Sequence, residues 1–213
     1  MTLNIQSFTF NPFQENTYVI YDDKNCVIID PGCYEKEEED ALVSFIEEKG
    51  LTPLALLGTH AHIDHVLGNQ FILDKYDIPY YLHNDDLATL NAVPSYAHLY
   101  DFPGYKNSPL PTNILKGGEK LTFGEISLDV FHTPGHAPGH VVYYNKENNF
   151  VINGDVLFKG SYGRVDLPGG SMEVLKKTIA EIMFELPDET SVFCGHGPST
   201  SIENEKRSNY ILM

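Results

Sequence analysis

Tryptophan is absent from this sequence of 213 residues, and both cysteine and basic residues are scarce. Three cysteines, Cys26, Cys33 and Cys194, are too few and too widely spaced for a disulfide framework, so the chain suits a reducing cytoplasm. Only 14 Lys and Arg residues stand against 30 Asp and Glu residues, and the formal net charge of −16 opposes binding to a phosphate backbone. These scarcities exclude a small disulfide-rich protein and argue against a nucleic-acid partner.

Long apolar runs are also missing. No stretch approaches the roughly 20 apolar residues that a membrane-spanning helix needs, and the first residues lack the basic and apolar segments of a signal peptide. We therefore expect a cytoplasmic protein without a membrane partner. A hydrophobic fraction of 42% supports a sizeable core, and the chain length predicts one domain over residues 1–213.

Hydrophobic periodicity predicts interleaved strands and helices in both halves of the chain. Strands are expected at residues 3–10, 17–22, 26–29, 53–58, 78–82, 121–123, 126–131, 141–144, 150–153 and 191–194. Helices are expected at residues 35–49, 69–76, 171–186 and 201–208. Ser171 is the expected N-cap of the third helix, and Asn11–Pro12 together with Glu15–Asn16 are interpreted as the turn between the first two strands. Such interleaving fits an α/β four-layer sandwich of helix, sheet, sheet and helix.

One aromatic segment has no regular period. Residues 93–105 contain several Pro, Gly and Tyr residues, and we interpret them as a loop. Long loops of this kind often act as lids over a binding site, so Tyr96 and Tyr100 are candidates for contact with a substrate. The alternative interpretation is aromatic packing of a surface loop.

The most informative stretch, residues 59–65, reads Thr-His-Ala-His-Ile-Asp-His. Neutral imidazole and carboxylate are the ligands that borderline divalent metals such as zinc prefer. His60 and His62 are two residues apart, so in an extended segment both side chains point to the same side and can reach one ion. Asp64 and His65 follow directly, and a turn there would direct them to a second ion. The motif follows an apolar predicted strand, which is where α/β sheets usually place their sites.

Further residues of metal-binding type follow other predicted strands. His136 ends Thr-Pro-Gly-His, Asp155 ends Gly-Asp, and His196 lies in Gly-His-Gly-Pro. A small residue beside each of them lets the backbone approach closely. Asp30 follows the strand at residues 26–29 and has two open interpretations: part of a simple turn, or a carboxylate hydrogen-bonded to a ligating histidine.

In this order and at these spacings, His-x-His-x-Asp-His, Pro-Gly-His, Gly-Asp and Gly-His-Gly-Pro resemble the metallo-β-lactamase superfamily over nearly the whole chain. The run Gly-Arg-Val-Asp-Leu-Pro-Gly-Gly-Ser at residues 163–171 is similar to the glyoxalase II-like hydrolases. The resemblance implies an αββα fold, two divalent metal ions and a hydrolytic reaction. It also implies seven ligands, with three for each metal and one bridging both: His60, His62 and His136 for the first metal, Asp64, His65 and His196 for the second, and Asp155 as the bridge.

Two departures from the family pattern narrow the expected function. β-Lactamases of this fold do not carry the bridging aspartate, so Asp155 argues against antibiotic hydrolysis as the main role. Glyoxalase II carries a C-terminal helical domain that contacts glutathione, whereas only 15 residues follow Pro198 here. His140 falls outside the implied ligand set and is expected to support the site or the fold, and His83 and His132 are expected to be structural.

The expected reaction is thioester hydrolysis. Two metals about 3.5–4 Å apart can hold a bridging hydroxide at neutral pH and polarise a carbonyl group. We expect two ions per chain, zinc first with iron or manganese as alternatives, and a small-molecule thioester such as S-lactoylglutathione as substrate, in a monomer or small homo-oligomer.

The remaining expectations concern the roles of single residues and the alternative functions. Asp64 and Asp155 are the expected catalytic residues, and Lys159, Tyr162 and Arg164 are the candidates to bind an anionic end of the substrate. The alternatives are a lactonase or phosphodiesterase of the same fold, a mononuclear-iron persulfide dioxygenase, and a non-enzymatic binding protein.

Overall fold

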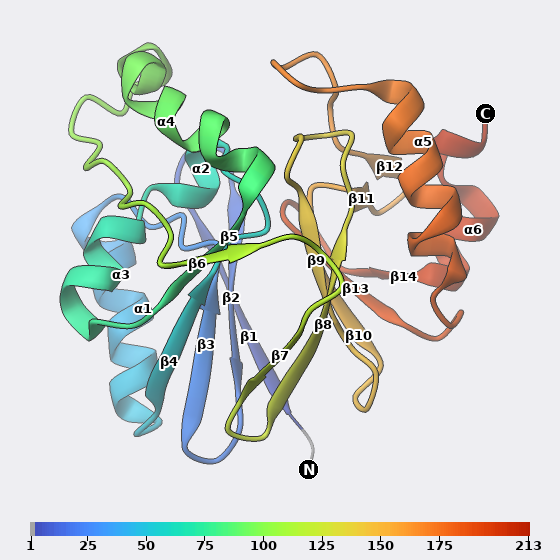
Figure 1. Cartoon of the computed structure of the whole chain (residues 1–213). Helices are drawn as coiled ribbons and strands as arrows, with labels where there is room; N and C mark the ends of the chain where they lie inside the picture. The colour runs from blue at the N-terminus through green and yellow to red at the C-terminus, as the bar shows by residue number, and fades with distance from the viewer. Residues whose placement is uncertain (1–2) are drawn as a thin grey trace.

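Two six-stranded β-sheets packed face to face form the centre of the computed structural model, which describes residues 3–213 (Figure 1). The strands of the first sheet lie in chain order: β1 (Asn4–Phe10), β2 (Glu15–Tyr21), β3 (Asn25–Ile29), β4 (Thr52–Leu57), β5 (Tyr80–His83) and β6 (Asn113–Leu115). The second sheet has the order β14 (Thr200–Ser201), β13 (Ser191–Cys194), β10 (Phe150–Gly154), β9 (Val141–Asn145), β8 (Ile126–His132) and β7 (Lys120–Phe123). A separate hairpin joins β11 (Leu157–Phe158) and β12 (Ser161–Tyr162).

Strand direction brings several strand ends to the same edge. In the first sheet β3, β4, β5 and β6 are parallel, while β1 and β2 pair antiparallel. In the second sheet β8, β10 and β13 run in the same direction, because β9 is antiparallel to both β8 and β10, and β13 is parallel to β10. The segments that follow these strands are therefore placed to meet at one edge of the sandwich, as in other α/β folds.

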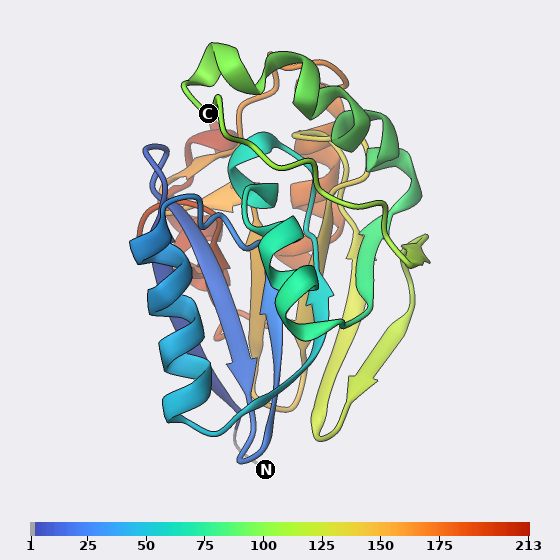
Figure 2. The same ribbon diagram turned by 90° about the vertical axis from the view of Figure 1, so that its left-hand side faces the viewer.

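Helices cover the outer faces of both sheets (Figures 1 and 2). The α-helices are α1 (Lys36–Glu48), α2 (Ile63–Val66), α3 (Asn69–Tyr76), α4 (Leu87–Tyr96), α5 (Met172–Glu181) and α6 (Ile202–Ser208). The 3₁₀ helices are η1 (Asn84–Asp86), η2 (Ala97–Tyr100), η3 (Met183–Glu185) and η4 (Tyr210–Leu212). Helices α1 and α3 pack outside the first sheet, and α5 and α6 pack outside the second.

Alternation along the strands produces the layers. Val27 points into the apolar layer between the two sheets, and its neighbour Ile28 points into the layer beneath α1 and α3. In the second sheet Val141 faces the first sheet, whereas Val142 packs beneath α5. β-Branched residues that bury both faces of a sheet are typical of strands covered on both sides. The predicted αββα sandwich is confirmed.

The interpretation of residues 93–105 as an irregular loop is wrong for its first half. Helix α4 continues to Tyr96 with Pro94 inside it, and η2 extends the helical path to Tyr100. Proline removes one helical hydrogen bond, but Leu90, Val93 and Ala97 are buried against the first sheet. This packing stabilises the helix in spite of the proline.

The turn predicted at Asn11–Pro12 and Glu15–Asn16 is confirmed in its first part and wrong in its second. The turn lies earlier, where Asn11 and Gln14 adopt positive φ, and β2 begins at Glu15. Both Glu15 and Asn16 are buried. The Asn16 amide donates hydrogen bonds to the carbonyls of Cys194 (3.0 Å) and Gly197 (2.8 Å). These two bonds tie β2 to the end of β13, so tertiary contacts override the turn preference of the two residues.

The predicted helix at residues 171–186 is found as α5 followed by η3, with the Ser171 hydroxyl accepting a hydrogen bond from the Val174 amide.

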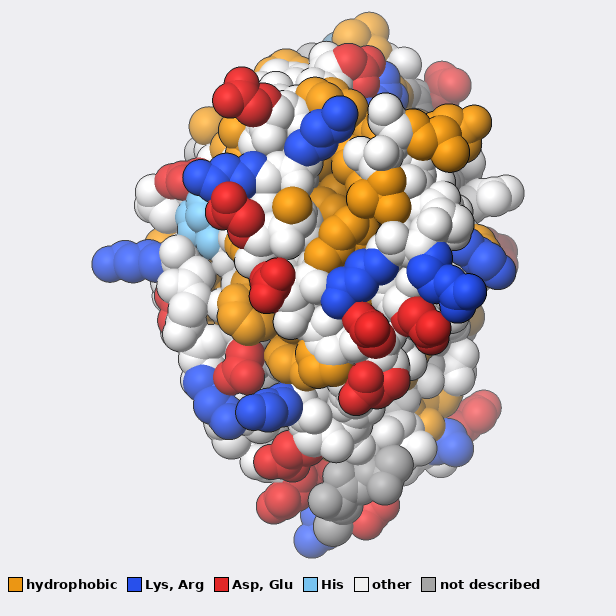
Figure 3. All heavy atoms as spheres, turned by 90° about the vertical axis from the view of Figure 1, so that its right-hand side faces the viewer, with side chains coloured by type: hydrophobic (Ala, Val, Ile, Leu, Met, Phe, Trp, Pro, Cys, Tyr) orange, Lys and Arg blue, Asp and Glu red, His pale blue; other side chains and the backbone are white. Residues whose placement is uncertain are grey.

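On the face that carries α5 and α6, basic and acidic side chains are interspersed (Figure 3). Among the described residues, no helix combines the length and the apolar character that crossing a bilayer requires.

Candidate metal centre and active site

The seven predicted ligands meet at one edge of the two sheets. The motif at residues 59–65 follows β4, and Asp30 follows β3 beside it. From the second sheet, His136 follows β8, Asp155 directly follows β10, and His196 follows β13. The predicted turn after His62 is the short helix α2, whose N-cap is His62 itself and which carries Asp64 and His65. The site is therefore assembled from segments far apart in the sequence.

Three histidines form the first cluster. The Nε2 atom of His136 lies 3.3 Å from Nε2 of His60 and 2.9 Å from Nδ1 of His62. Two nitrogens that each lie about 2.0–2.1 Å from a tetrahedral zinc are about 3.3 Å apart. All three side chains are buried. The spacing suits three nitrogens around one small cation.

The second cluster contains Asp64, His65 and His196. The Oδ2 atom of Asp64 lies 3.2 Å from Nε2 of His196 and 3.7 Å from Nε2 of His65. Carboxylate and imidazole at these separations are again compatible with one shared cation. The arrangement groups the three residues that the family resemblance implies for the second metal.

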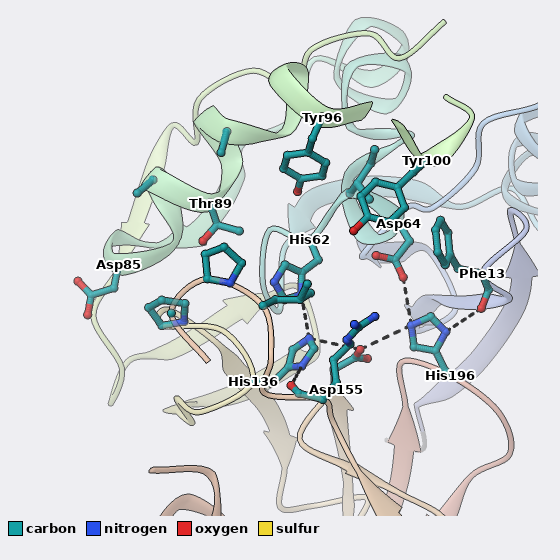
Figure 4. A pocket seen from close by; sticks show the side chains of 18 of the residues that line it. Phe13, His62, Asp64, Asp85, Thr89, Tyr96, Tyr100, His136, Asp155 and His196 are labelled. Atoms are coloured by element: carbon teal, nitrogen blue, oxygen red, sulfur yellow. Dashed lines mark hydrogen bonds and ion pairs between the residues drawn. The ribbon is translucent and has the colours of Figure 1, made fainter. Parts of the chain in front are cut away.

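Asp155 lies between the two clusters (Figure 4). Its Oδ1 atom is 3.5 Å from Nε2 of His65, and its Oδ2 atom is 3.5 Å from Nε2 of His136 and 3.6 Å from Nε2 of His196. One carboxylate therefore faces nitrogens of both clusters, which is the position that a bridging ligand requires.

Hydrogen bonds on the outer side of the rings determine which nitrogen faces the cluster. Nδ1 of His136 is 2.7 Å from the Arg164 carbonyl, and Nδ1 of His196 is 3.1 Å from the Phe13 carbonyl. A carbonyl oxygen only accepts hydrogen bonds, so both Nδ1 atoms must carry the proton. The Nε2 lone pairs are then directed into the site, as is usual for histidines that bind a metal.

Asp30 orients one histidine of each cluster. Its carboxylate accepts hydrogen bonds from the Thr59 amide (2.7 Å), the Thr59 hydroxyl and Nδ1 of His65 (3.1 Å). Because the Thr59 hydroxyl donates to Asp30, its oxygen is free to accept from Nδ1 of His60 at 3.0 Å. Asp30 also has a positive φ of 47°, so it both turns the chain after β3 and supports the site.

Two buried polar atoms indicate whether a cation would fit between the two clusters. Nε2 of His65 and Oδ1 of Asp155 lie 3.5 Å apart, and neither has a hydrogen-bond partner within the described residues. Buried polar atoms are normally satisfied, and a cation bound by both would satisfy them. Burial, with the neighbouring His136, lowers the pKa of His62 to about 3, so this ring is neutral and able to ligate at neutral pH. The donor set therefore fits divalent metal ions.

A cavity of about 890 Å³ opens above both clusters, a size typical of small-molecule sites. Tyr96 and Tyr100 extend over it from α4 and η2 (Figure 4). Tyr162 and Arg164, two of the residues predicted to bind substrate, line the same cavity. Within the described chain the lining does not include Lys159, the third, which is exposed.

The chain matches the family model described as "Metallo-beta-lactamase superfamily" over residues 10–196. It belongs to the metallo-β-lactamase superfamily. The family makes it a metal-dependent hydrolase.

Individual superfamily relatives are similar along nearly their whole length. A protein named "Probable metallo-hydrolase YqgX" from Bacillus subtilis is 41% identical over 94% of this chain and 93% of its own. "Hydroxyacylglutathione hydrolase GloC" from Haemophilus influenzae is 35% identical over 99% of this chain and 98% of its own.

Two solved structures are similarly close. "BLEG-1 B3 metallo-beta-lactamase" is 38% identical with a TM-score of 0.90 over 99% of this chain and 100% of its own. TTHA1623, in a di-iron-bound form, is 38% identical with a TM-score of 0.86 over 96% of this chain and 98% of its own.

Three further histidines, His140, His83 and His132, are buried or half-buried near the site. Nε2 of His140 accepts a hydrogen bond from the Asp155 amide at 3.0 Å, and its ring stacks on His60 at 4.8 Å. The rings of His83 and His132 stack in parallel, 4.0 Å apart with an interplanar angle of 11°. Parallel rings direct their lone pairs side by side, which does not suit one shared ion.

Asp86 is a supporting residue that the sequence analysis missed. Its buried carboxylate accepts hydrogen bonds from the Ala61 amide (2.6 Å) and the Gly139 amide (2.8 Å). Burial raises the pKa of Asp86 to about 6, although the two hydrogen bonds oppose this. Asp86 thus joins the start of α4 to the loops that carry His62 and His136. The sequence signal that could have indicated this residue is the acidic pair Asp85 and Asp86, which follows a predicted strand and precedes an apolar run.

Proposed function

We propose that this metal-dependent hydrolase cleaves acyl thioesters with a dinuclear centre, as glyoxalase II does. The observation that carries the proposal is the carboxylate of Asp155, which faces His65 and His196 of one cluster and His136 of the other at 3.5–3.6 Å. The name of the Haemophilus influenzae relative, a hydroxyacylglutathione hydrolase that matches almost end to end, supports the thioester class.

The proposed ligands are the seven residues of the two clusters. Two divalent ions, when bound, would supply a water of lowered pKa and a Lewis acid for the substrate carbonyl. Zinc suits the imidazole and carboxylate donors, and iron is the alternative that the di-iron form of TTHA1623 supports.

Residues of the chain would position the reacting groups and handle the proton. Although burial acts in the opposite direction, the neighbouring His65 lowers the pKa of Asp64, so Asp64 is ionised at neutral pH and can accept a proton. Tyr96 points its hydroxyl toward His62 at the floor of the cavity (Figure 4). Burial raises the pKa of Tyr96, so its hydroxyl keeps its proton and can donate a hydrogen bond to an oxyanion.

The glutathione half of such a substrate is proposed to bind weakly. Arg164 is the single Lys or Arg side chain in the lining of the cavity within the described residues. Its guanidinium already forms two hydrogen bonds of 2.7 Å with Asp166. Binding from groups remote from the reacting centre normally helps to orient a substrate, and this site offers few charged groups for that purpose.

A substrate panel tests the proposal. Protein loaded separately with zinc, iron or manganese is assayed with S-lactoylglutathione, a lactone, a phosphodiester and a β-lactam, the last because of the similarity to BLEG-1. Oxygen uptake with glutathione persulfide tests the dioxygenase alternative. We expect thioester hydrolysis to have the highest kcat/KM, and two metals per chain by elemental analysis. Hydrolysis of another class alone, or no thioester hydrolysis with any metal, would contradict the proposal.

A further inference from the structure

The cavity extends from the two metal clusters in two directions (Figure 4). On the side of Thr89 and Asp85, small and apolar side chains form what we call the α4 arm, which is lined by Ala88, Thr89, Ala92, Pro138, Leu167 and Pro168. On the other side lie Phe13, Tyr100 and His196. We propose that the α4 arm binds an uncharged aliphatic acyl chain, so that medium-chain acyl thioesters are the preferred substrates.

Helix α4 leaves space for such a chain because of its small residues. Ala88, Ala92 and Tyr96 line the cavity at spacings of four residues, which places them on one face of the helix. The other face carries Leu90 and Val93, which are buried in the core beside the first sheet. The helix thus has two apolar faces. The core covers one, and the alanines of the other border the cavity.

The floor of the α4 arm is held in place by close backbone contacts. A Cβ atom at Gly139 would lie 2.5 Å from the Asp86 amide, and one at Gly169 would lie 2.4 Å from Cγ of Pro138. Gly169 also has a positive φ of 87°, so a side chain there would be strained as well. These contacts fix Pro138 between α4 and the segment that carries Leu167. The arm is therefore a preformed groove, open to solvent where Ala88, Ala92 and Pro168 are exposed, and binding a chain in it requires little rearrangement.

Charge in the arm favours a neutral chain. Asp85 lies at its outer end and is exposed. Arg164, the one Lys or Arg among the described residues that line the cavity, is bound to Asp166 through both Nε and Nη2. A carboxylate at the end of the acyl chain would meet apolar walls and an acidic residue, and burying an unpaired charge is costly.

The opposite side suits the thiol half of the substrate. Tyr100 and His196 supply polar groups there, next to the aromatic ring of Phe13 (Figure 4). With the carbonyl group at the clusters, a polar thiol half on this side leaves the acyl chain to the α4 arm. This assignment rests on the proposed thioesterase activity, which the experiment tests separately.

The test compares N-acetylcysteamine thioesters with straight acyl chains from acetyl to octanoyl, on the metal-loaded protein. Burial of one methylene contributes about 0.8 kcal/mol, which is about fourfold in kcat/KM. Partial burial should still raise kcat/KM by at least about tenfold from acetyl to hexanoyl. Adipoyl, in which a carboxylate replaces the terminal methyl of hexanoyl, should fall at least about tenfold below hexanoyl.

Substitutions on α4 test whether the acyl chain of the substrate binds in the α4 arm. Ala92→Leu fills the arm and should lower the ratio of the hexanoyl to the acetyl kcat/KM by at least about tenfold. Ala88→Leu is the second variant, in case the first unfolds. Both replacements keep a residue of high helix propensity. The matched control is Asn91→Leu, an exposed position on the same helix outside the lining of the cavity, which should leave the ratio unchanged. Thermal unfolding checks that each variant is folded.

The outcomes separate the two proposals. Absence of any thioester hydrolysis contradicts the proposed function, and the inference falls with it. Hydrolysis that is independent of acyl length, or a length effect found only when the thiol half is extended, overturns the inference and leaves the thioesterase standing. A hexanoyl preference that both alanine variants retain would also overturn it, because the chain would then bind elsewhere.

Discussion

Replacement of Asp30 by asparagine should weaken binding of the second metal without removing any ligand. Asparagine adopts positive φ readily, so the 47° φ at this position does not oppose the change. One carboxylate oxygen becomes an NH₂ group, which can only donate. If the remaining oxygen keeps the Thr59 amide, the NH₂ faces Nδ1 of His65.

Two donors cannot satisfy each other, so His65 must move its proton from Nδ1 to Nε2. The proton would then replace the lone pair that faces Asp64 and Asp155 at 3.7 and 3.5 Å. Changes to a carboxylate that supports a ligating histidine typically lower metal affinity by about 10- to 100-fold. That range corresponds to about 1.4–2.7 kcal/mol.

The assay is a chelator competition that measures both metal affinities of D30N and wild type, followed by elemental analysis of protein recovered from gel filtration. Asp77→Asn is the matched control. It makes the same substitution at a similar φ of 48°, but at an exposed residue that ends α3. D77N should bind both metals as the wild type does.

The second metal should be lost from D30N at a chelator concentration that the wild type withstands. If D30N keeps both affinities within about twofold of wild type, then Asp30 does not control the tautomer of His65. The hydrogen-bond pattern assigned to the site would then be incorrect. An equal loss in D77N would point to a general effect of the substitution instead.

Three further predictions concern other positions. Asp155→Ala should lose far more activity than His140→Ala, which removes only a support, and equal losses with both metals retained would contradict the bridging role. Replacing Tyr96 and Tyr100 by Ala should raise KM more than it lowers stability, and unchanged kinetics on every substrate would leave only a packing role. Burial raises the pKa of Asp86 from 3.8 to about 6, so this carboxyl stabilises the fold below about pH 4. Its contribution to the free energy of unfolding falls by up to about 3 kcal/mol as pH rises through 6. In chemical unfolding of the metal-free protein, the stability advantage of wild type over Asp86→Asn should therefore shrink between about pH 4 and 7, and a constant difference would contradict the shift.

The layers of the fold and the gathering of the candidate ligands could be predicted because each rests on a local pattern. Strands such as β3 and β10 are short β-branched runs ended by a turn. Asp30 and Asp155 directly follow those two strands. When parallel strands share an edge, residues that follow them converge without any knowledge of the loops.

What escaped prediction depends on contacts between distant segments. Pro94 reads as a helix breaker, and only the burial of Leu90 and Val93 against the first sheet makes α4 a continuous helix. Arg164 reads as a free cation, yet its guanidinium is paired with Asp166 two residues later. A pattern in the sequence gives the type of side chain at each position, but the partner that modifies its chemistry depends on the loop conformation.

The two buried aspartates together explain the geometry of the His-x-His segment. The Thr59 amide donates to Asp30, and the Ala61 amide donates to Asp86. The alternate residues, His60 and His62, then direct their rings into the first cluster. An extended segment whose backbone amides are hydrogen-bonded at every second residue has little freedom to rotate. The two rings are therefore positioned before any ion binds. Asp86 also accepts a hydrogen bond from the Gly139 amide. A movement of α4 would therefore displace residues of the metal centre and of the cavity wall together.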